Sequence, residues 1–200
     1  TFNITKKNLT DLDVRIDPIP NQLYIGGQDI KPVPTIKWGP DPSKPITLSQ
    51  ADYVVTYKQG EDEKSQDVGT VEMTISGAEK NYTGTITTTF EIVKVPLADV
   101  KAELLDTDSK DSYGYTGYQI TPSVKLSYTS PNSKGEIVMT PELWGYEISY
   151  GQNQYVGTNG SITITAKPDG NCTGSKAISF KIERRKLTDE TTIRLEPNEI

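Results

Sequence analysis

The chain of 200 residues contains no histidine and only one cysteine, Cys172. Histidine is the commonest general base and the commonest transition-metal ligand in proteins, so its absence removes the usual component of both kinds of site. A single cysteine excludes disulfides within the chain and zinc sites built from thiolates. We expect a non-catalytic protein that holds no metal and no cofactor, in which Cys172 is a small packing residue.

The sequence also lacks clustered positive charge and long apolar runs. Its net charge is −6, and its only basic cluster is Arg184-Arg185-Lys186. A surface for nucleic acid or anionic lipid needs concentrated positive charge, and a membrane span needs about 20 apolar residues. We therefore expect no nucleic-acid partner and no membrane insertion in this segment. Low isoelectric point, scarce cysteine and strands rich in Ser, Thr and Tyr favour an extracellular location, on a bacterial surface or secreted.

One pattern occurs three times, as TFNITKKNLTD at 1–11, TFEIVKVPLAD at 89–99 and SFKIERRKLTD at 179–189. Its phenylalanines, Phe2, Phe90 and Phe180, are 88 and then 90 positions apart. A fixed period of this length indicates a repeated module, with a closing strand that passes directly into the next module. We predict one domain at 1–95, where 1–8 closes a preceding repeat, a second at 96–186, and the truncated start of a third at 187–200.

Short runs of alternating apolar and polar residues recur within each copy. In the first copy they lie at 9–17, 33–38, 53–57, 70–75 and 86–92, with residues 39–47 as a loop. In the second they lie at 124–128, 146–150 and 162–164. Residues 98–106 could form a helix on composition, but the counterpart 10–17 alternates like a strand, so we predict a strand.

This pattern predicts an all-β fold of two tandem small antiparallel β-sandwich domains. Ig-like topology is the default for such a domain. We expect two separate modest cores and, because the link at 94–99 is short and contains Pro96, a head-to-tail rod.

The residues also resemble a known family, the Ig-like tandem repeats (MBG-type and related) of Gram-positive cell-surface proteins. The matching pieces are Tyr24–Pro32, Leu48, Asp52–Tyr57, Val71–Ile75, Asn81–Gly84 and Thr89–Ile92. The second copy departs from the pattern, with Gly145 in place of an aspartate and Cys172 in place of a tyrosine. The resemblance implies stalk or spacer repeats of adhesins and other surface proteins, without catalytic residues, whose partners are neighbouring repeats of the same chain.

Two acidic features could bind a cation. Residues 106–111 (DTDSKD) begin like a calcium loop, but Lys110 stands at a ligand position and Gly117 where an EF-hand requires glutamate, so we predict a solvated loop. The repeated Asp11, Asp99 and Asp189 could hold a cation between modules, although capping of a turn explains them more simply.

The alternative function depends on aromatic residues concentrated in the second copy. Exposed tyrosine and tryptophan are typical of surfaces that bind glycans or proteins. The candidates with least precedent as core residues are Tyr113, Tyr118, Tyr128, Trp144 and Tyr155. On this hypothesis, loops 128–142 and 151–158 recognise a host glycan or protein, and Trp144→Ala abolishes binding.

Overall fold

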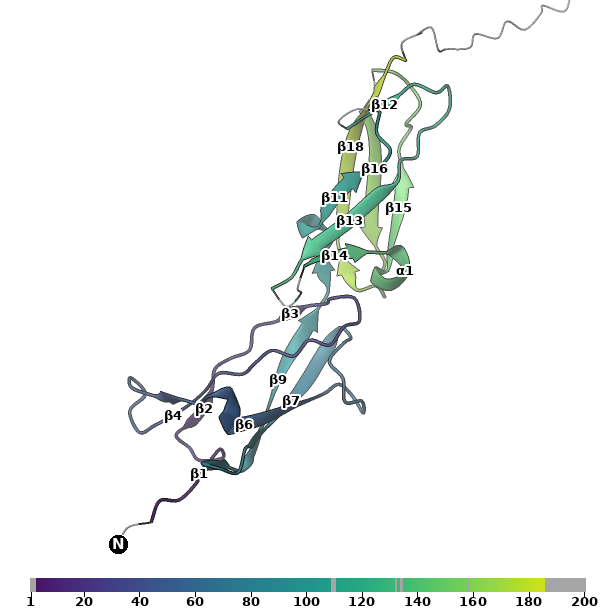
Figure 1. The fold of residues 1–200 in the computed structure, drawn as a ribbon. Coiled ribbons are helices and arrows are strands. Elements are labelled where there is room, and N and C mark those ends of the chain that lie inside the picture. Colours follow the sequence, from purple (N-terminus) through teal and green to yellow (C-terminus); the bar gives the residue numbers. More distant parts are fainter. Residues whose placement is uncertain (1–2, 109–110, 132, 134, 158, 186–200) are drawn as a thin grey trace, which may run out of the picture.

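The computed structural model describes residues 3–108, 111–131, 133, 135–157 and 159–185. These residues form eighteen strands, two 3-10 helices and one short α-helix. The sheets lie in two groups, end to end along an elongated molecule (Figure 1). We call residues 3–93 the N-terminal half and residues 95–185 the C-terminal half, with Lys94 between them. The nearly all-β, sandwich-like fold predicted from the sequence is confirmed.

The N-terminal half contains two sheets and a short parallel pair. Its elements are β1 (Lys7–Asn8), β2 (Val14–Ile16), β3 (Gln22–Leu23), β4 (Ile36–Trp38), β5 (Ile46–Thr47), η1 (Gln50–Asp52), β6 (Tyr53–Lys58), β7 (Gly69–Gly77), β8 (Tyr82–Thr83) and β9 (Thr85–Val93). The four-stranded sheet has the order β3-β9-β7-β6, and the three-stranded sheet has the order β2-β4-β5. Strand β1 pairs with β8.

The C-terminal half repeats this organisation. Its elements are β10 (Val95–Pro96), η2 (Leu97–Asp99), β11 (Lys101–Leu104), β12 (Ser112–Gly114), β13 (Val124–Thr129), β14 (Glu136–Met139), α1 (Pro141–Trp144), β15 (Tyr146–Tyr150), β16 (Asn159–Ala166), β17 (Cys172–Thr173) and β18 (Ser175–Glu183). The sheets have the orders β12-β18-β16-β15 and β11-β13-β14, and β10 pairs with β17.

Each pairing in one half has a counterpart of the same direction in the other. The pairs β1-β8 and β10-β17 are parallel, as are β3-β9 and β12-β18. The remaining ladders of both halves are antiparallel. Phe90 and Phe180 are both buried, in β9 and β18 respectively. Phe2 and the segment 187–200 lie outside the described residues.

Alternation of side chains explains the long strands. In β7, Val71, Met73 and Ile75 are fully buried, and more exposed residues separate them. Successive side chains of a strand point to opposite faces, so this spacing puts one apolar row against the core. The partner β9 adds Phe90 and Ile92 to the same interior.

Several short segments differ from the sequence prediction. Leu12 is exposed, because a turn closed by hydrogen bonds from the Asp11 and Val14 amides delays the strand of 9–17 until Val14. The loop predicted at 39–47 ends in the edge strand β5. Residues 98–106 contain the predicted strand only as β11, after the 3-10 turn η2.

The boundary between the halves also falls differently. Val95, the last residue of the predicted first domain, pairs with Cys172 of the C-terminal half.

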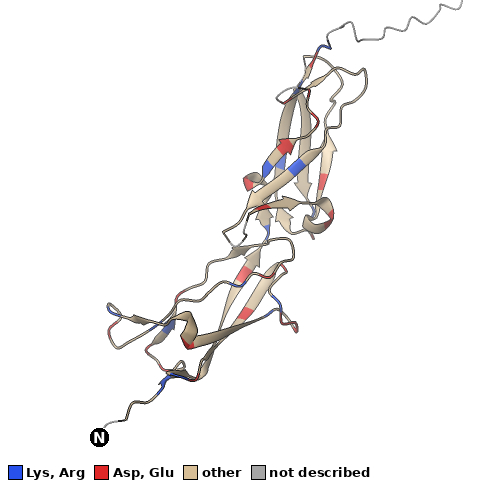
Figure 2. Ribbon diagram, viewed as in Figure 1, with Lys and Arg blue, Asp and Glu red and all other residues tan. Residues whose placement is uncertain are grey.

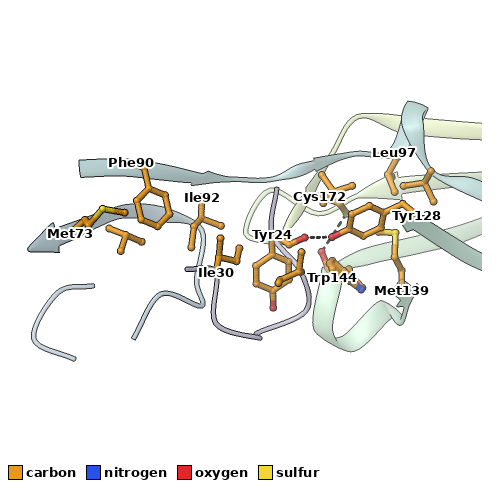
Figure 3. Packing of buried hydrophobic residues seen from close by; sticks show 14 of the residues in the cluster. Tyr24, Ile30, Met73, Phe90, Ile92, Leu97, Tyr128, Met139, Trp144 and Cys172 are labelled. Carbon is orange, nitrogen blue, oxygen red and sulfur yellow. Dashed lines mark hydrogen bonds between the residues drawn. The ribbon is translucent and has the colours of Figure 1, made fainter. Parts of the chain in front are cut away.

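The interior is not divided at Lys94 as expected for two separate cores. One cluster of buried residues runs from the N-terminal half into the near part of the C-terminal half. A smaller cluster, of Tyr113, Ile162, Phe180 and Ile182, fills the far end. The cores are joined because aromatic residues of both halves fill the space between them (Figure 3). No described helix is long and apolar enough to cross a membrane.

Candidate functional site

The candidate site is the joint between the halves, where the chain crosses with a single residue. Strand β9 ends at Val93 and β10 begins at Val95. The Val95 amide donates to the Asn171 carbonyl at 3.0 Å, so the C-terminal half begins immediately after the crossing. The Lys94 ammonium donates to the Pro168 carbonyl at 2.8 Å, which ties the connecting residue itself to the C-terminal half.

The N-terminal half contributes a turn that directly follows β3. The Tyr24 amide donates to the Val93 carbonyl at 3.0 Å, so the turn is attached to the end of the last strand of this half. Gly26 then has φ of +76°, a conformation that residues with a side chain rarely adopt. Tyr24 and Ile25 are both buried, although they lie at the end of their own sheet.

The C-terminal half receives this turn with two aromatic side chains. The ring of Trp144 lies edge-on to Tyr24, with centroids 4.8 Å apart and planes at 86°. Tyr128 makes the same kind of contact with Trp144, at 5.6 Å and 82°. Trp144 has no exposed surface. We call Tyr24, Tyr128 and Trp144 the aromatic joint; Figure 3 shows them between the two groups of core residues.

A hydrogen bond also crosses the joint. The Tyr128 hydroxyl donates to the backbone carbonyl of Tyr24. Burial raises the pKa of this hydroxyl well above its usual range, so it remains a donor at all ordinary pH values. The indole nitrogen of Trp144 has no hydrogen-bond partner among the described residues, so Trp144 contributes to the joint by packing.

The one-turn helix α1 places Trp144. Pro141 opens it, and Gly145 closes it in the left-handed conformation with φ of +65°, its amide donating to the Pro141 carbonyl at 3.0 Å. A Cβ atom on Gly145 would lie 2.4 Å from the Gly170 Cα. This crowding explains why glycine precedes Tyr146, whereas Asp52 precedes Tyr53 in the N-terminal half.

Cys172 contacts the C-terminal end of the same helix. Its thiol contacts the Trp144 carbonyl at 3.3 Å, and the neighbouring Asn171 amide donates to that carbonyl at 2.7 Å. Burial raises the pKa of the Cys172 thiol, which keeps it in the unreactive protonated form. Its burial agrees with the packing role predicted for it.

The five aromatic candidates for ligand binding do not form one surface. Tyr128 and Trp144 are buried in the aromatic joint. Tyr113 is buried in the far core, stacked edge-on against Phe180, and its hydroxyl donates to the Leu105 carbonyl at 2.7 Å. Tyr118 and Tyr155 are exposed, at 80% and 59%. Trp144→Ala is therefore unsuitable as a test of ligand binding, because it removes a core side chain.

The acidic candidates are engaged locally. Asp108 accepts a hydrogen bond from the Gly114 amide at 2.6 Å, and Asp11 lies 2.9 Å from the Lys7 ammonium. Asp189 and the residues 109–110 lie outside the described part of the chain. Among the residues that are described, no three acidic or cysteine side chains gather as a metal site would require.

Sequence reasoning missed the role of Tyr24. Its partner Tyr128 is 104 positions away in the chain. No local pattern signals a contact at that distance. The available signal was the repeat itself, because a turn at the end of one module must meet the start of the next.

The sequence matches no model of a known protein family, and no curated protein is significantly similar to it. The interpretation of the joint therefore depends on its own geometry.

Proposed function

We propose that the chain is a pair of tandem Ig-like domains that act as a non-catalytic spacer in an extracellular bacterial surface protein, such as an adhesin. The observation that carries this proposal is the joint. One residue connects two halves of equivalent strand pairing, and a buried aromatic contact holds them end to end. A spacer needs this property, because it must keep a distance rather than form a pocket.

The joint resists bending for two reasons. A link of one residue provides little slack, and Lys94 is itself bound to the C-terminal half. Bending would also expose the rings of Tyr24, Tyr128 and Trp144 to water. Exposure of even ~200 Å² of apolar surface costs about 5 kcal/mol, so the bent state would be rarely populated.

The surface charge fits a solvated spacer. Acidic and basic residues are interspersed over both halves in the view of Figure 2. Many form local pairs, for example Lys125 with Glu136 at 3.1 Å and Lys37 with Asp17 at 2.5 Å. Interspersed charge of both signs keeps an extended protein soluble without creating a strong field toward one class of partner.

A second candidate function is recognition of a host glycan or protein. It is favoured by Tyr118 and Tyr155, which are exposed together with Val156 in the C-terminal half. Of the loops in the original hypothesis, 151–158 contributes to this candidate through Tyr155. Residues 128–142, predicted as a loop, include the end of β13, the strand β14 and the start of α1, and Tyr128 of β13 lies in the aromatic joint instead.

Small-angle X-ray scattering of the 200-residue chain tests the spacer. A single compact globule of this length has a radius of gyration of about 16 Å. Two units of ~12 Å each, with centres at least one nine-residue strand or ~30 Å apart, give about 20 Å or more. A value near the compact one would contradict the proposal. A glycan array with Tyr118→Ala and Tyr155→Ala tests the second candidate, which predicts binding that both variants lose.

A further inference from the structure

We propose that the far end of the C-terminal half is a docking surface for another unit of the same kind. The additional unit would pack against Tyr115 in the way that the C-terminal half packs against Tyr24. This inference rests on the proposed function, since it concerns the next position in a tandem array. The unit that docks there is a copy of the C-terminal half, with its Tyr128 and Trp144.

The two ends share the same backbone construction. Tyr24 directly follows β3, and Tyr115 directly follows β12, the equivalent strand of the other half. The Tyr115 amide donates to the Glu183 carbonyl at 2.8 Å, as the Tyr24 amide does to Val93 at 3.0 Å. Two residues later each turn has a glycine with positive φ, +76° at Gly26 and +83° at Gly117. The backbone of the Tyr24 turn, which contacts the C-terminal half, therefore has an equivalent at Tyr115, at the far end of the C-terminal half.

The two ends differ in whether they are covered. Tyr24 is 2% exposed, whereas Tyr115 is 41% exposed. A Cβ atom on Gly26 would meet the Trp144 ring at 3.5 Å, whereas no atom of the described residues lies within 4 Å of the same position on Gly117. The same turn thus has an aromatic partner at the joint and an open approach at the far end.

The uncovered end is also more apolar than a solvated loop requires. Tyr118, in the position of Gly27, is exposed, as are Tyr155 and Val156 of the loop 151–158. The N-terminal half has the polar sequence KQGEDEKSQD at 58–67 in place of that loop. Neighbouring exposed aromatic and aliphatic side chains are typical of interaction surfaces.

The choice of occupant follows from the receiving side of the joint. Trp38 and Tyr128 occupy equivalent positions in the central strands of the two three-stranded sheets. Trp38 lies two residues after the buried Ile36 in β4, and Tyr128 lies two residues after the buried Leu126 in β13. Trp38 has no hydroxyl to donate, and its indole nitrogen already donates to the Tyr82 hydroxyl at 3.3 Å.

The counterpart of α1 in the N-terminal half is η1 (Gln50–Asp52), which contains no aromatic residue. The N-terminal half therefore lacks both groups that receive the turn. A unit with a Tyr128 and a Trp144 supplies them.

The test uses an extended chain, in which a second copy of residues 95–185 directly follows Arg184 and so reproduces a one-residue link. Tyr115→Ala is introduced into the 200-residue chain and into the extended chain, and thermal unfolding is followed for all four proteins. We expect almost no change in the 200-residue chain. In the extended chain we expect a fall of several degrees, as for Tyr24→Ala in either protein.

A second extended chain, with Gly-Ser-Gly-Ser inserted before the added copy, keeps all three units but removes the short link. If docking occurs, Tyr115→Ala has less effect in this chain. Equal effects of Tyr115→Ala in the 200-residue and extended chains would overturn the proposal. A free glycan that binds the 200-residue chain and is lost in Tyr118→Ala would also overturn it. Scattering separates these outcomes from failure of the spacer, because the spacer requires an elongated 200-residue chain whether or not a further unit docks.

Discussion

The hydroxyl of Tyr128 joins the two halves through a hydrogen bond within the aromatic joint. It donates to the Tyr24 carbonyl, a backbone group at the end of the other half's sheet. A buried carbonyl without a donor costs free energy, so this bond also satisfies a group that the joint removes from water. The bond fixes which face of Tyr128 meets the turn, whereas apolar contact alone is not directional.

Tyr128→Phe should weaken the contact between the halves while leaving each half folded. The ring remains against Trp144, and the lost hydrogen bond should lower the free energy of unfolding by about 1 kcal/mol. Urea denaturation measures the loss, and hydrogen exchange at the Gly26 and Ile25 amides locates it.

Tyr150→Phe is the matched control for this substitution. Its hydroxyl donates to the Pro122 carbonyl at 3.1 Å within the C-terminal half. It should cost a similar free energy without faster exchange in the Tyr24 turn. Unchanged stability and exchange in Tyr128→Phe would show that the hydroxyl does not hold the joint.

At the scale of elements, the long strands could be predicted from the sequence and the short ones could not. Strands β6, β7 and β9 contain six to nine residues, enough for the two-residue period to be recognised. Strands β3, β5 and β12 contain two or three residues, too few to show any period.

The helix α1 was missed for the same reason, and it is the element that positions Trp144. Its four residues contain barely one turn and no helical repeat of apolar residues. The sequence therefore indicated which residues were aromatic but not which of them are exposed. Burial of Tyr113, Tyr128 and Trp144 is set by contacts between distant segments, so of the five candidates only Tyr118 and Tyr155 are exposed.

The crossing from β9 to β10 provides a test at this scale. Insertion of Gly-Ser-Gly-Ser after Lys94 lengthens the link without altering any residue of the aromatic joint. A flexible link lowers the effective concentration of one half at the other, so the joint should open more often. Trp144 emission should shift toward longer wavelength, and the two halves should unfold in separate transitions.

The same insertion after Gly60 is the control. Gly60 lies in the polar loop of the N-terminal half, with nothing within 4 Å of its Cβ position. Surface loops tolerate insertions at small cost, so Trp144 emission should stay unchanged. Identical behaviour of the two insertions would contradict the importance of the short link.

For the whole molecule, the absence of histidine has a consequence for stability. With no imidazole, no side chain has an ordinary pKa between those of the carboxylates and the thiol. The buried thiol of Cys172 titrates above its usual range. The unfolded thiol loses its proton at about pH 8.5, whereas the folded one retains it, so stability should begin to fall there. Folding should release or bind few protons from about pH 5 to pH 8, and stability should be nearly constant in that range.

Stability should fall on both sides of this plateau. On the acid side, hydrogen bonding from Lys7 lowers the pKa of Asp13, and hydrogen bonding from Ser127 and Lys125 lowers that of Glu136. A carboxylate with a lowered pKa in the folded state stabilises the protein above its unfolded pKa. This contribution is lost as the pH falls through the folded value, below about pH 4.

On the alkaline side, burial raises the pKa of Tyr146 to about 12. The unfolded tyrosine loses its proton near pH 10 while the folded one retains it, so the free energy of unfolding falls between about pH 10 and pH 12 by up to ~1.4 kcal/mol per unit. Urea midpoints from pH 3 to pH 12 measure both limits. Tyr146→Phe removes one titrating group and should make the alkaline decline less steep. A midpoint that moves strongly between about pH 5 and pH 8 would contradict this account, because no side chain of the described residues has an ordinary pKa in that range.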